Sequence, residues 1–581
     1  MTDKSDRRAF EVWAPRATRV ELEIHGGRVA MEAPADGYYR VEAEARPGDD
    51  YMFVIDGNAR PDPRSQWQPH GVHGASRVVD HAAFEWTDRS WQGSGLSQAL
   101  VYELHVGTFT PEGTFDAAIA KLGYLADLGV TMIELMPVAQ FPGARGWGYD
   151  GVDLYAPHHG YGGPDGLKRL VDACHAAGLG VIVDVVYNHL GPSGNHLGAF
   201  GPYFTDRYST PWGQAVNFDG SASDHVRSFF IQNALMWLRD YHCDGLRLDA
   251  VHAILDTSAI HILEEIQEHV ALLAARSNRS MALIAESDLN DPRVVRAPEL
   301  GGYGMDAQWS DDLHHALHAA LTGERTGYYA DFGKIADIAK ALRHGYVYDG
   351  VSSSFRGRRH GRPAGDISGR RFLGYLQTHD QIGNRAQGDR SSALMSAGLL
   401  KVGAALVLTS PFTPMLFQGE EWGASTPFLY FTDHEDPALG RAVSEGRRRE
   451  FASFGWAPEE VPDPQDPGTF ERSRLDWSEI DRSPHRELLQ WHKELIRFRR
   501  AEPALSDGRR DLVRTRLDEN ALWLVVERDP VTVVCNLSAA EVTVPLSAER
   551  TVRIALTSST TPAIFPGEVT LPPESVTIFT A

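Results

Sequence analysis

Hydrophobic and polar positions follow three different patterns along the chain. From residue 8 to about residue 56, short apolar runs with partial alternation are separated by Pro, Gly and Asp, which is typical of β-strands joined by turns. From about residue 97, nearly continuous apolar runs alternate with amphipathic segments, which indicates buried parallel strands covered by helices. After about residue 503 the β pattern returns, with apolar strands expected at 522–528, 531–537, 542–546, 551–556 and 575–580. We therefore expect an N-terminal β-sandwich over 1–92, a central α/β domain over 93–502 and a C-terminal antiparallel β-sandwich over 503–581.

The central part predicts eight strands with helices between them. Apolar residues from Val226 to Tyr241 recur at helical spacing. Leu488, Trp491, Leu495 and Phe498 predict a last helix, with Ser483 at its N-cap and Pro484 at its first position. Eight strands that alternate with helices over about 400 residues predict a (β/α)8 TIM barrel with large loop insertions. The expected strands are residues 101–104, 130–135, 179–187, 245–248, 281–285, 305–308, 371–377 and 413–417.

Composition and charge narrow the class of protein. The chain has 581 residues and a net charge of −22, which argues against nucleic acid or an anionic membrane as the main partner. No apolar run is long enough for a membrane span, and the first residues lack the apolar segment of a signal peptide. Cys174, Cys243 and Cys535 are far apart, so neither a disulfide framework nor a zinc site is expected, and a reducing cytoplasmic setting fits best.

Polar residues at the carboxyl ends of the strands are the candidates for catalysis, because the active sites of TIM barrels lie there. Arg247 and Asp249 are two residues apart, so on a strand both side chains point to the same side, and the guanidinium would keep the carboxylate ionised. Glu286 follows an apolar run without a cation next to it in the sequence, which favours a raised pKa and a general acid. Asp380, beside His379, is a third carboxylate at a strand end.

Glycosidases use two carboxyl groups in different environments: an ionised one acts as the nucleophile, and one with a raised pKa donates the proton. A single Asp at a strand end is more often a helix cap, and a single Glu there can simply begin a loop. Three carboxylates at three rim positions favour the catalytic interpretation. Thirteen Trp, 19 Tyr and 24 His also leave room for a carbohydrate site, although most of these rings are expected to fill the core.

Four stretches resemble the four signature regions of the α-amylase family of glycoside hydrolases: DVVYNH at 184–189, GLRLDAVH at 245–252, IAESD at 284–288 and QTHDQIGN at 377–384. The resemblance implies that Asp249 is the nucleophile, Glu286 the acid/base and Asp380 the carboxylate that holds sugar hydroxyls and distorts the ring. It also implies that Arg247 orients the nucleophile, that His189 and His379 bind the glucose at subsite −1, and that Tyr149, within WGYD, stacks beneath that glucose. Asp184 matches a mostly structural aspartate.

The resemblance extends to particular members of the family. FEVWAPRA near the start looks like the N-terminal sandwich of branching, debranching and trehalose-releasing members, and VYELHVGTF at 101–109 is similar to branching enzymes and maltooligosyl trehalose trehalohydrolases. His252 and the loop 427–437 favour the trehalohydrolases and are the expected walls of subsites +1 and +2. The run EGRRRE at 445–450 is interpreted as a solvated helix face.

This resemblance implies a retaining hydrolase that cuts the α-1,4 bond next to the terminal trehalose of maltooligosyl trehalose. Its product would be trehalose, and a maltooligosyl trehalose synthase would act in the same pathway. The alternatives are a 1,4-α-glucan branching enzyme and, more remotely, a catalytically silent glucan-binding protein on the same fold. No cofactor or metal is expected. Asn188 matches a calcium-binding asparagine of many α-amylases, but residues 190–218 offer no obvious set of oxygen ligands, so we interpret Asn188 as structural.

Overall fold

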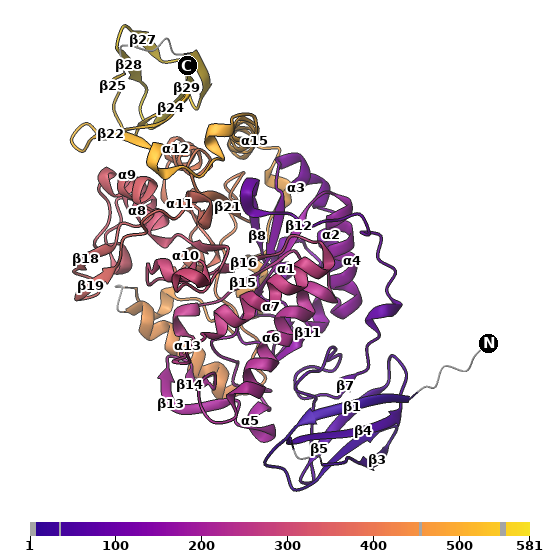
Figure 1. Ribbon diagram of the computed structural model, residues 1–581. Coiled ribbons are helices and arrows are strands. Elements are labelled where there is room, and N and C mark those ends of the chain that lie inside the picture. The colour runs from indigo at the N-terminus through magenta and orange to yellow at the C-terminus, as the bar shows by residue number, and fades with distance from the viewer. Residues whose placement is uncertain (1–6, 34–35, 453–455, 547–552) are drawn as a thin grey trace.

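A closed barrel of eight parallel strands forms the centre of the computed structural model, which describes residues 7–33, 36–452, 456–546 and 553–581 (Figure 1). Each strand pairs with the next one in chain order, and β21 returns to pair with β8, which closes the barrel. All eight predicted strands overlap the observed ones, so the predicted TIM barrel is confirmed. The barrel strands are β8 (Val101–Leu104), β9 (Met132–Leu135), β12 (Gly180–Val185), β15 (Gly245–Leu248), β16 (Ala282–Ala285), β17 (Ala307–Trp309), β20 (Phe372–Gly374) and β21 (Thr413–Phe417).

Every residue of these eight strands is buried. The reason is that one side of each strand faces the interior of the barrel and the other faces the surrounding helices, so continuous apolar runs replace alternation. The helices of the described chain are α1 (Val106–Phe109), α2 (Phe115–Ile119), α3 (Leu122–Leu128), α4 (Gly163–Ala176), α5 (Leu197–Phe200), α6 (Ser223–Arg239), α7 (Ile262–Ser277), α8 (Asp311–Thr322), α9 (Ile335–His344), α10 (His379–Gly383), α11 (Ser391–Leu394), α12 (Ala397–Leu408), α13 (Pro437–Ala452), α14 (Pro467–Arg472) and α15 (His485–Ala501).

The start of α15 differs from the prediction by one residue. Pro484 occupies the N-cap position, and no side chain caps the helix there, so the expected Ser483 cap is wrong. The preceding turn takes over part of this role, because the backbone N–H of Arg486 donates to the carbonyl of Arg482 at 2.9 Å. The apolar face of α15 is as predicted, with Leu488, Trp491 and Leu495 buried.

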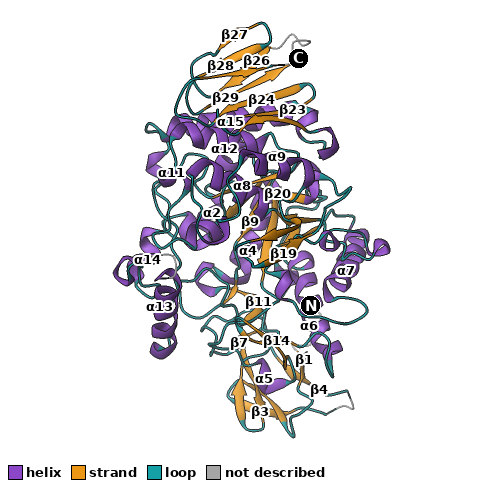
Figure 2. Ribbon diagram, turned by 90° about the vertical axis from the view of Figure 1, so that its left-hand side faces the viewer, coloured by secondary structure: helices purple, strands orange, loops and turns teal. Residues whose placement is uncertain are grey.

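Antiparallel sheets lie at opposite ends of the barrel (Figure 1, Figure 2). The N-terminal part of the chain forms two of these sheets. One pairs β1 with β4, and the other follows the order β3-β2-β5-β6, with β7 paired to β5. At the C-terminal end a five-stranded sheet of order β22-β23-β24-β29-β26 accompanies the three-stranded sheet β25-β28-β27. The N-terminal strands are β1 (Arg7–Trp13), β2 (Val20–Ile24), β3 (Gly27–Ala30), β4 (Tyr38–Glu44), β5 (Asp50–Ile55), β6 (Asn58–Arg60) and β7 (Ser76–Arg77); the C-terminal ones are β22 (Arg514–Asp518), β23 (Trp523–Arg528), β24 (Val531–Asn536), β25 (Val542–Pro545), β26 (Arg553–Thr557), β27 (Ala563–Phe565), β28 (Glu568–Leu571) and β29 (Ser575–Thr580).

All five predicted C-terminal strands have a counterpart among these, although the first two residues of the segment expected at 551–556 lie outside the described residues. Three two-stranded hairpins arise from the barrel loops: β10 (Ala139–Gln140) with β11 (Asp153–Pro157), β13 (Phe204–Thr210) with β14 (Gly213–Val216), and β18 (Asp349–Ser353) with β19 (Arg358–Gly361).

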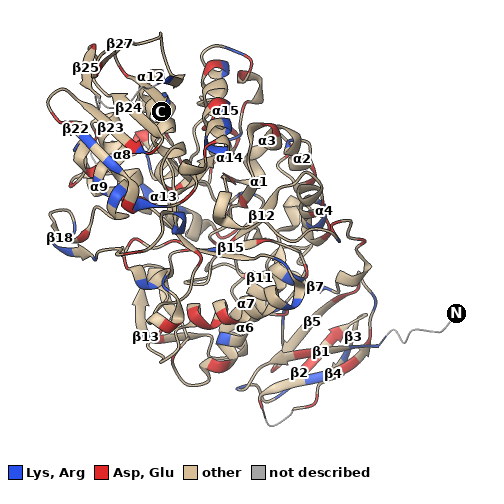
Figure 3. Ribbon diagram, turned by 45° about the horizontal axis from the view of Figure 1, so that its top comes forward, with Lys and Arg blue, Asp and Glu red and all other residues tan. Residues whose placement is uncertain are grey.

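Charged residues occur in all parts of the fold, and the cysteines lie deep inside it. Figure 3 shows acidic and basic residues distributed over the N-terminal sheets, the barrel helices and the C-terminal part. Cys174, Cys243 and Cys535 are buried free thiols. Within the described ranges, no helix has the length and apolar character that crossing a membrane requires.

Candidate active site

The predicted site residues meet in one cleft at the carboxyl ends of the barrel strands. The cleft has a volume of about 710 Å³. Six of the eight predicted residues line it, and the other two, Arg247 and His379, are buried against those six, at 0% and 1% exposure. The six are Tyr149, His189, Asp249, His252, Glu286 and Asp380.

Asp249 directly follows β15 and is held from two sides. Arg247, two residues earlier on the strand, donates from Nη1 to Asp249 Oδ1 at 3.0 Å. Asn188, beyond the end of the neighbouring strand β12, donates from Nδ2 to Asp249 Oδ2 at 2.7 Å and to its backbone carbonyl at 2.9 Å. Both carboxylate oxygens are therefore oriented by fixed donors, and the predicted pairing of Arg247 with Asp249 is present.

Glu286 directly follows β16, the next strand of the barrel. Its Oε2 accepts from Arg247 Nη2 at 2.8 Å and from the backbone N–H of Ala250 at 2.9 Å. Glu286 has no cation next to it in the sequence, but in the fold the neighbouring strand β15 supplies Arg247. Burial still raises the pKa of Glu286, helped by the nearby Asp249 charge and opposed by Arg247.

Asp380 lies in the first turn of α10, and Thr378 and Gln381 form a reciprocal capping box at the start of that helix. Thr378 Oγ1 accepts from the backbone N–H of Asp380 at 3.2 Å, and Gln381 Oε1 accepts from that of Thr378 at 2.7 Å. This capping box fixes the direction in which His379 and Asp380 leave the strand. Burial raises the pKa of Asp380, while the His379 ring, 3.5 Å from Oδ1, opposes that rise.

Tyr149 and His189 also line the cleft. The Tyr149 hydroxyl donates to Asp184 Oδ2 at 2.7 Å, and its ring lies 5.2 Å from the His379 ring at an angle of 24°. His189 Nδ1 is hydrogen-bonded to Asn188 Oδ1, and its ring stacks on Trp212 at 4.5 Å. Burial lowers the pKa of His189 to about 4, so its ring is neutral at pH 7.

His252 and the loop 427–437 meet the prediction only in part. His252 lines the cleft, 4.0 Å from Asp288. Of the loop, Tyr430 lines the cleft, whereas Phe428 and Phe431 are fully buried. The cleft wall nearest His252 and Asp288 includes the turn between β18 and β19, where Arg356 Nη1 lies 3.0 Å from Asp288 and the neighbouring Phe355 is 49% exposed.

One arginine of the run 445–450 is part of the site, which corrects the interpretation of that run as a solvated face. Arg447 lines the cleft and donates to the Gly383 carbonyl at 2.7 Å and to Asn384 Oδ1 at 3.2 Å. Its guanidinium also lies 4.6 Å from the centre of the Tyr430 ring. Arg449 is exposed as expected, and Arg448 is half-buried, 4.0 Å from Asp463.

Several further residues of the site have no clear signal in the sequence. Trp212 and Phe355 are unusual because each is 49% exposed, but only the fold shows that both sit on hairpins above the cleft. Asn188 was expected to be structural, and it does hold a catalytic candidate in place. Among the described residues, no group of three or more His, Cys, Asp or Glu is arranged to hold a metal ion.

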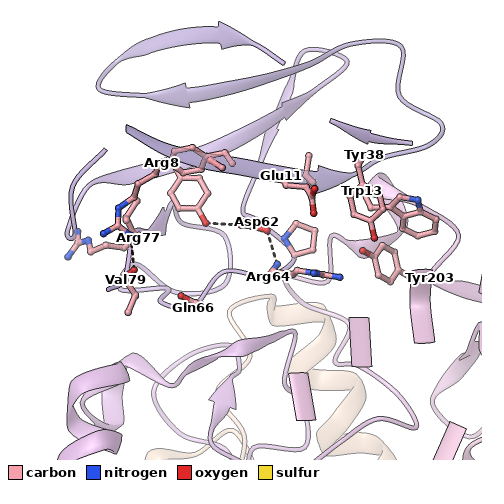
Figure 4. Close-up of a pocket in the computed structure, with 16 residues that line it drawn as sticks. Arg8, Glu11, Trp13, Tyr38, Asp62, Arg64, Gln66, Arg77, Val79 and Tyr203 are labelled. Atoms are coloured by element: carbon pink, nitrogen blue, oxygen red, sulfur yellow. Dashed lines mark hydrogen bonds between the residues drawn. The ribbon is translucent and has the colours of Figure 1, made fainter. Parts of the chain in front are cut away.

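A second cavity, of about 310 Å³, lies between the N-terminal sheets and the barrel (Figure 4). Buried Asp62 accepts there from the Tyr51 hydroxyl at 2.7 Å, while Trp13 and Tyr203 pack edge to face. None of the residues that line this cavity also lines the cleft.

Comparison with known proteins agrees with this geometry. A family model described as the alpha amylase catalytic domain matches residues 80–199, and a domain of unknown function (DUF3459) matches residues 509–578. A crystal structure from Salmonella typhimurium is 40% identical with a TM-score of 0.91 and covers 99% of this chain and 98% of its own. A 1,4-alpha-glucan branching enzyme of Pseudoalteromonas atlantica is 31% identical over 53% of this chain and 49% of its own.

Two relatives match nearly the whole chain. The malto-oligosyltrehalose trehalohydrolase of Arthrobacter ramosus is 52% identical over 545 residues, which are 93% of this chain and 94% of that one. The enzyme of the same name from Mycobacterium tuberculosis H37Rv is 50% identical over 549 residues, again 93% of this chain and 94% of that one. The chain therefore belongs to the malto-oligosyltrehalose trehalohydrolase family of glycoside hydrolases.

Proposed function

We propose that the protein hydrolyses the α-1,4 bond next to the terminal trehalose of maltooligosyl trehalose and releases trehalose and a maltooligosaccharide. The observation that carries this proposal is the pair of carboxylates, Asp249 and Glu286, joined by one guanidinium at the floor of a cleft large enough for several sugar rings. Membership of the trehalohydrolase family supports the choice of substrate.

The proposed reaction has two steps. Asp249 attacks the anomeric carbon at subsite −1, the bond to the trehalose oxygen breaks, and Glu286 gives its proton to that oxygen. Water then gives a proton to the Glu286 carboxylate, its oxygen attacks the anomeric carbon, and Asp249 leaves as a free carboxylate. Arg247 is suited to both steps, because it contacts both carboxylates.

The remaining residues are proposed to bind substrate. Asp380 would accept hydrogen bonds from sugar hydroxyls at subsite −1, where Tyr149 would stack and His189 would donate or accept. His252 lies beside Glu286, the proton donor, and so belongs to the side of the leaving trehalose. We also propose that the chain divides into three domains, with boundaries at residues 92 and 502. We further propose that the protein acts in the cytoplasm and that a maltooligosyl trehalose synthase supplies its substrate.

The branching-enzyme alternative differs only in the acceptor, since a sugar hydroxyl replaces water in the second step. The match to a branching enzyme covers half of this chain, which favours the trehalohydrolase. A silent glucan-binding protein is disfavoured, because all three carboxylates are present and Asp249 and Glu286 are oriented by hydrogen bonds.

Product analysis tests the proposal. The protein is incubated with maltotriosyl trehalose or, as a control, with a maltooligosaccharide of equal length, and the products are separated by chromatography. We expect trehalose and maltotriose from the first substrate and much slower cleavage of the second. New α-1,6 branches on amylose without trehalose would replace the proposal by the branching enzyme, and no turnover of either substrate would favour the silent binding protein.

A further inference from the structure

A buried carboxylate that the proposed chemistry does not use lies behind His379. Glu103 lies on β8 and is 1% exposed. Its Oε1 is hydrogen-bonded to His379 Nδ1, and its Oε2 accepts from the backbone N–H of His379 at 3.2 Å. Glu103 does not line the cleft, and both of its carboxylate oxygens contact His379, through which it can influence the reaction.

The hydrogen bonds beyond His379 bear on which of its ring nitrogens carry hydrogen. The Tyr149 hydroxyl lies 2.8 Å from His379 Nε2 and 2.7 Å from Asp184 Oδ2. Burial raises the pKa of Asp184 to about 7, and Arg247, whose Nη1 donates to Asp184 Oδ2 at 2.6 Å, opposes that rise. An ionised Asp184 can only accept, so the single hydrogen of Tyr149 then points to Asp184. The contact between Tyr149 and His379 therefore needs a hydrogen on Nε2, while the contact with the Glu103 carboxylate needs one on Nδ1.

We propose that Glu103 is a positioning residue that keeps His379 doubly protonated, so that one hydrogen-bond direction runs from His379 through Tyr149 to Asp184. This inference deepens the proposed function and rests on it, because it concerns the same subsite −1. The positive ring also lies 3.5 Å from Asp380, whose charge it stabilises.

The charges around His379 agree with this state. Burial opposes a charged ring, and Arg247 on β15 does too, but Glu103 and Asp380 outweigh them and raise the pKa of His379 to about 9. The other titratable neighbours are His105 after β8, Glu134 on β9 and Tyr149. Burial lowers the pKa of His105 to about 4, so that ring is neutral at pH 7, and burial raises the pKa of Glu134 well above its usual range.

The consequence concerns Asp380. Its pKa is raised by burial and held back by the His379 charge. A neutral His379 would let the Asp380 pKa rise further and would reverse the hydrogen bond to Tyr149. Asp380 would then lose part of the charge with which it is proposed to accept sugar hydroxyls, and Tyr149 would lose its contact with Asp184.

Glu103→Gln tests this, with Glu134→Gln as the matched control. Glu134 is the direct register partner of Glu103 in the barrel and equally buried, but it has no contact with His379 among the hydrogen bonds of the described residues. The first readout is the titration of His379 in the free protein, followed by NMR with ¹⁵N-labelled histidine and assigned with His379→Gln. The second readout is kcat/KM for trehalose release between pH 5 and 9.

We expect the wild-type His379 ring to stay doubly protonated at pH 7.5 and to lose a proton well below that pH in Glu103→Gln. The kcat/KM of Glu103→Gln should fall by about 10-fold or more at pH 8 and recover toward pH 5.5, because acid restores the proton. Glu134→Gln should keep the wild-type titration and pH profile.

A wild-type His379 ring that titrates near pH 6.5 or below would overturn the proposal without any variant. A loss of activity in Glu103→Gln that is equal at every pH, with unchanged His379 titration, would also overturn it and leave Glu103 a packing role. The titration needs no substrate, so it separates this inference from the proposed function, which fails only if the wild-type protein releases no trehalose.

Discussion

Arg247 lies 2.8 Å from Glu286 and uses the other terminal nitrogen of the same guanidinium to bind Asp249. This arrangement couples the charges of the two carboxylates. Burial raises the pKa of Glu286, Arg247 opposes that rise and the Asp249 charge adds to it, which favours the proton on Glu286 while Asp249 is free. Once Asp249 is esterified its charge disappears, and Arg247 then favours the ionised Glu286 that the second step requires as a base.

Arg247→Lys should therefore impair the chemical step. A lysine ammonium is a single point charge and cannot bind both carboxylates as a planar fork does. We expect kcat to fall by about 10²-fold or more, with a smaller change in KM. The control is Arg169→Lys, which alters an exposed ion pair with Asp116; neither residue lines the cleft. A kcat for Arg247→Lys within about threefold of the wild-type value would contradict the shared-cation account.

The stereochemical course follows from the assignment of Asp249 as a nucleophile. Two displacements at one carbon retain its configuration. Proton NMR during the first turnovers should show the new reducing end as the α-anomer, before mutarotation supplies the β-anomer. Initial appearance of the β-anomer would mean inversion, and Asp249 would then act as a base.

His252 should influence selectivity more than chemistry. Its side chain lines the cleft next to Glu286 and Asp288, on the side where the trehalose leaves. His252→Ala is expected to lower the ratio of kcat/KM for maltotriosyl trehalose to that for a maltooligosaccharide by about 10-fold. The control His25→Ala changes an exposed residue of the N-terminal sheets. An unchanged ratio would remove His252 from the walls of subsites +1 and +2.

A buried carboxyl predicts how stability depends on pH. Glu420 follows β21 and is 5% exposed, and burial raises its pKa to about 8. Because this pKa is raised in the folded state, the contribution of Glu420 to stability is full below pH 4 and is lost as the pH rises to 8 and above. Glu420→Gln cannot ionise, so its Tm relative to wild type should increase from pH 5.5 to pH 8.5. A Tm difference that stays constant or falls over that interval would argue against the raised pKa.

The sequence alone predicts the barrel and the paired Arg247 and Asp249 because both depend on local pattern. Continuous apolar runs identify strands that are buried on two faces, and two residues separated by one on a strand share a side. These rules need no knowledge of which strands are neighbours.

The contacts that the sequence did not predict join strands and loops far apart in the chain. Arg247 and Glu286 meet because β15 and β16 are adjacent in the barrel, with Leu248 opposite Ala285. Glu103 and His379 are 276 residues apart and meet only because the barrel closes between β21 and β8. The same limit explains why the sequence did not reveal Arg247 beside Glu286, and why Trp212 and Phe355 were not expected at the cleft.

Trapping the glycosyl–enzyme tests the central claim, that Asp249 attacks the sugar, most directly. The Glu286→Gln variant is treated with a fluorinated maltosyl fluoride, whose leaving group needs no acid, so the first step proceeds while the second lacks its base. After proteolysis, mass spectrometry should find the sugar on the peptide that contains Asp249, and Asp249→Asn combined with Glu286→Gln should give no adduct. Attachment to another carboxylate, or turnover of the fluoride with no adduct, would contradict the assignment of Asp249 as the nucleophile.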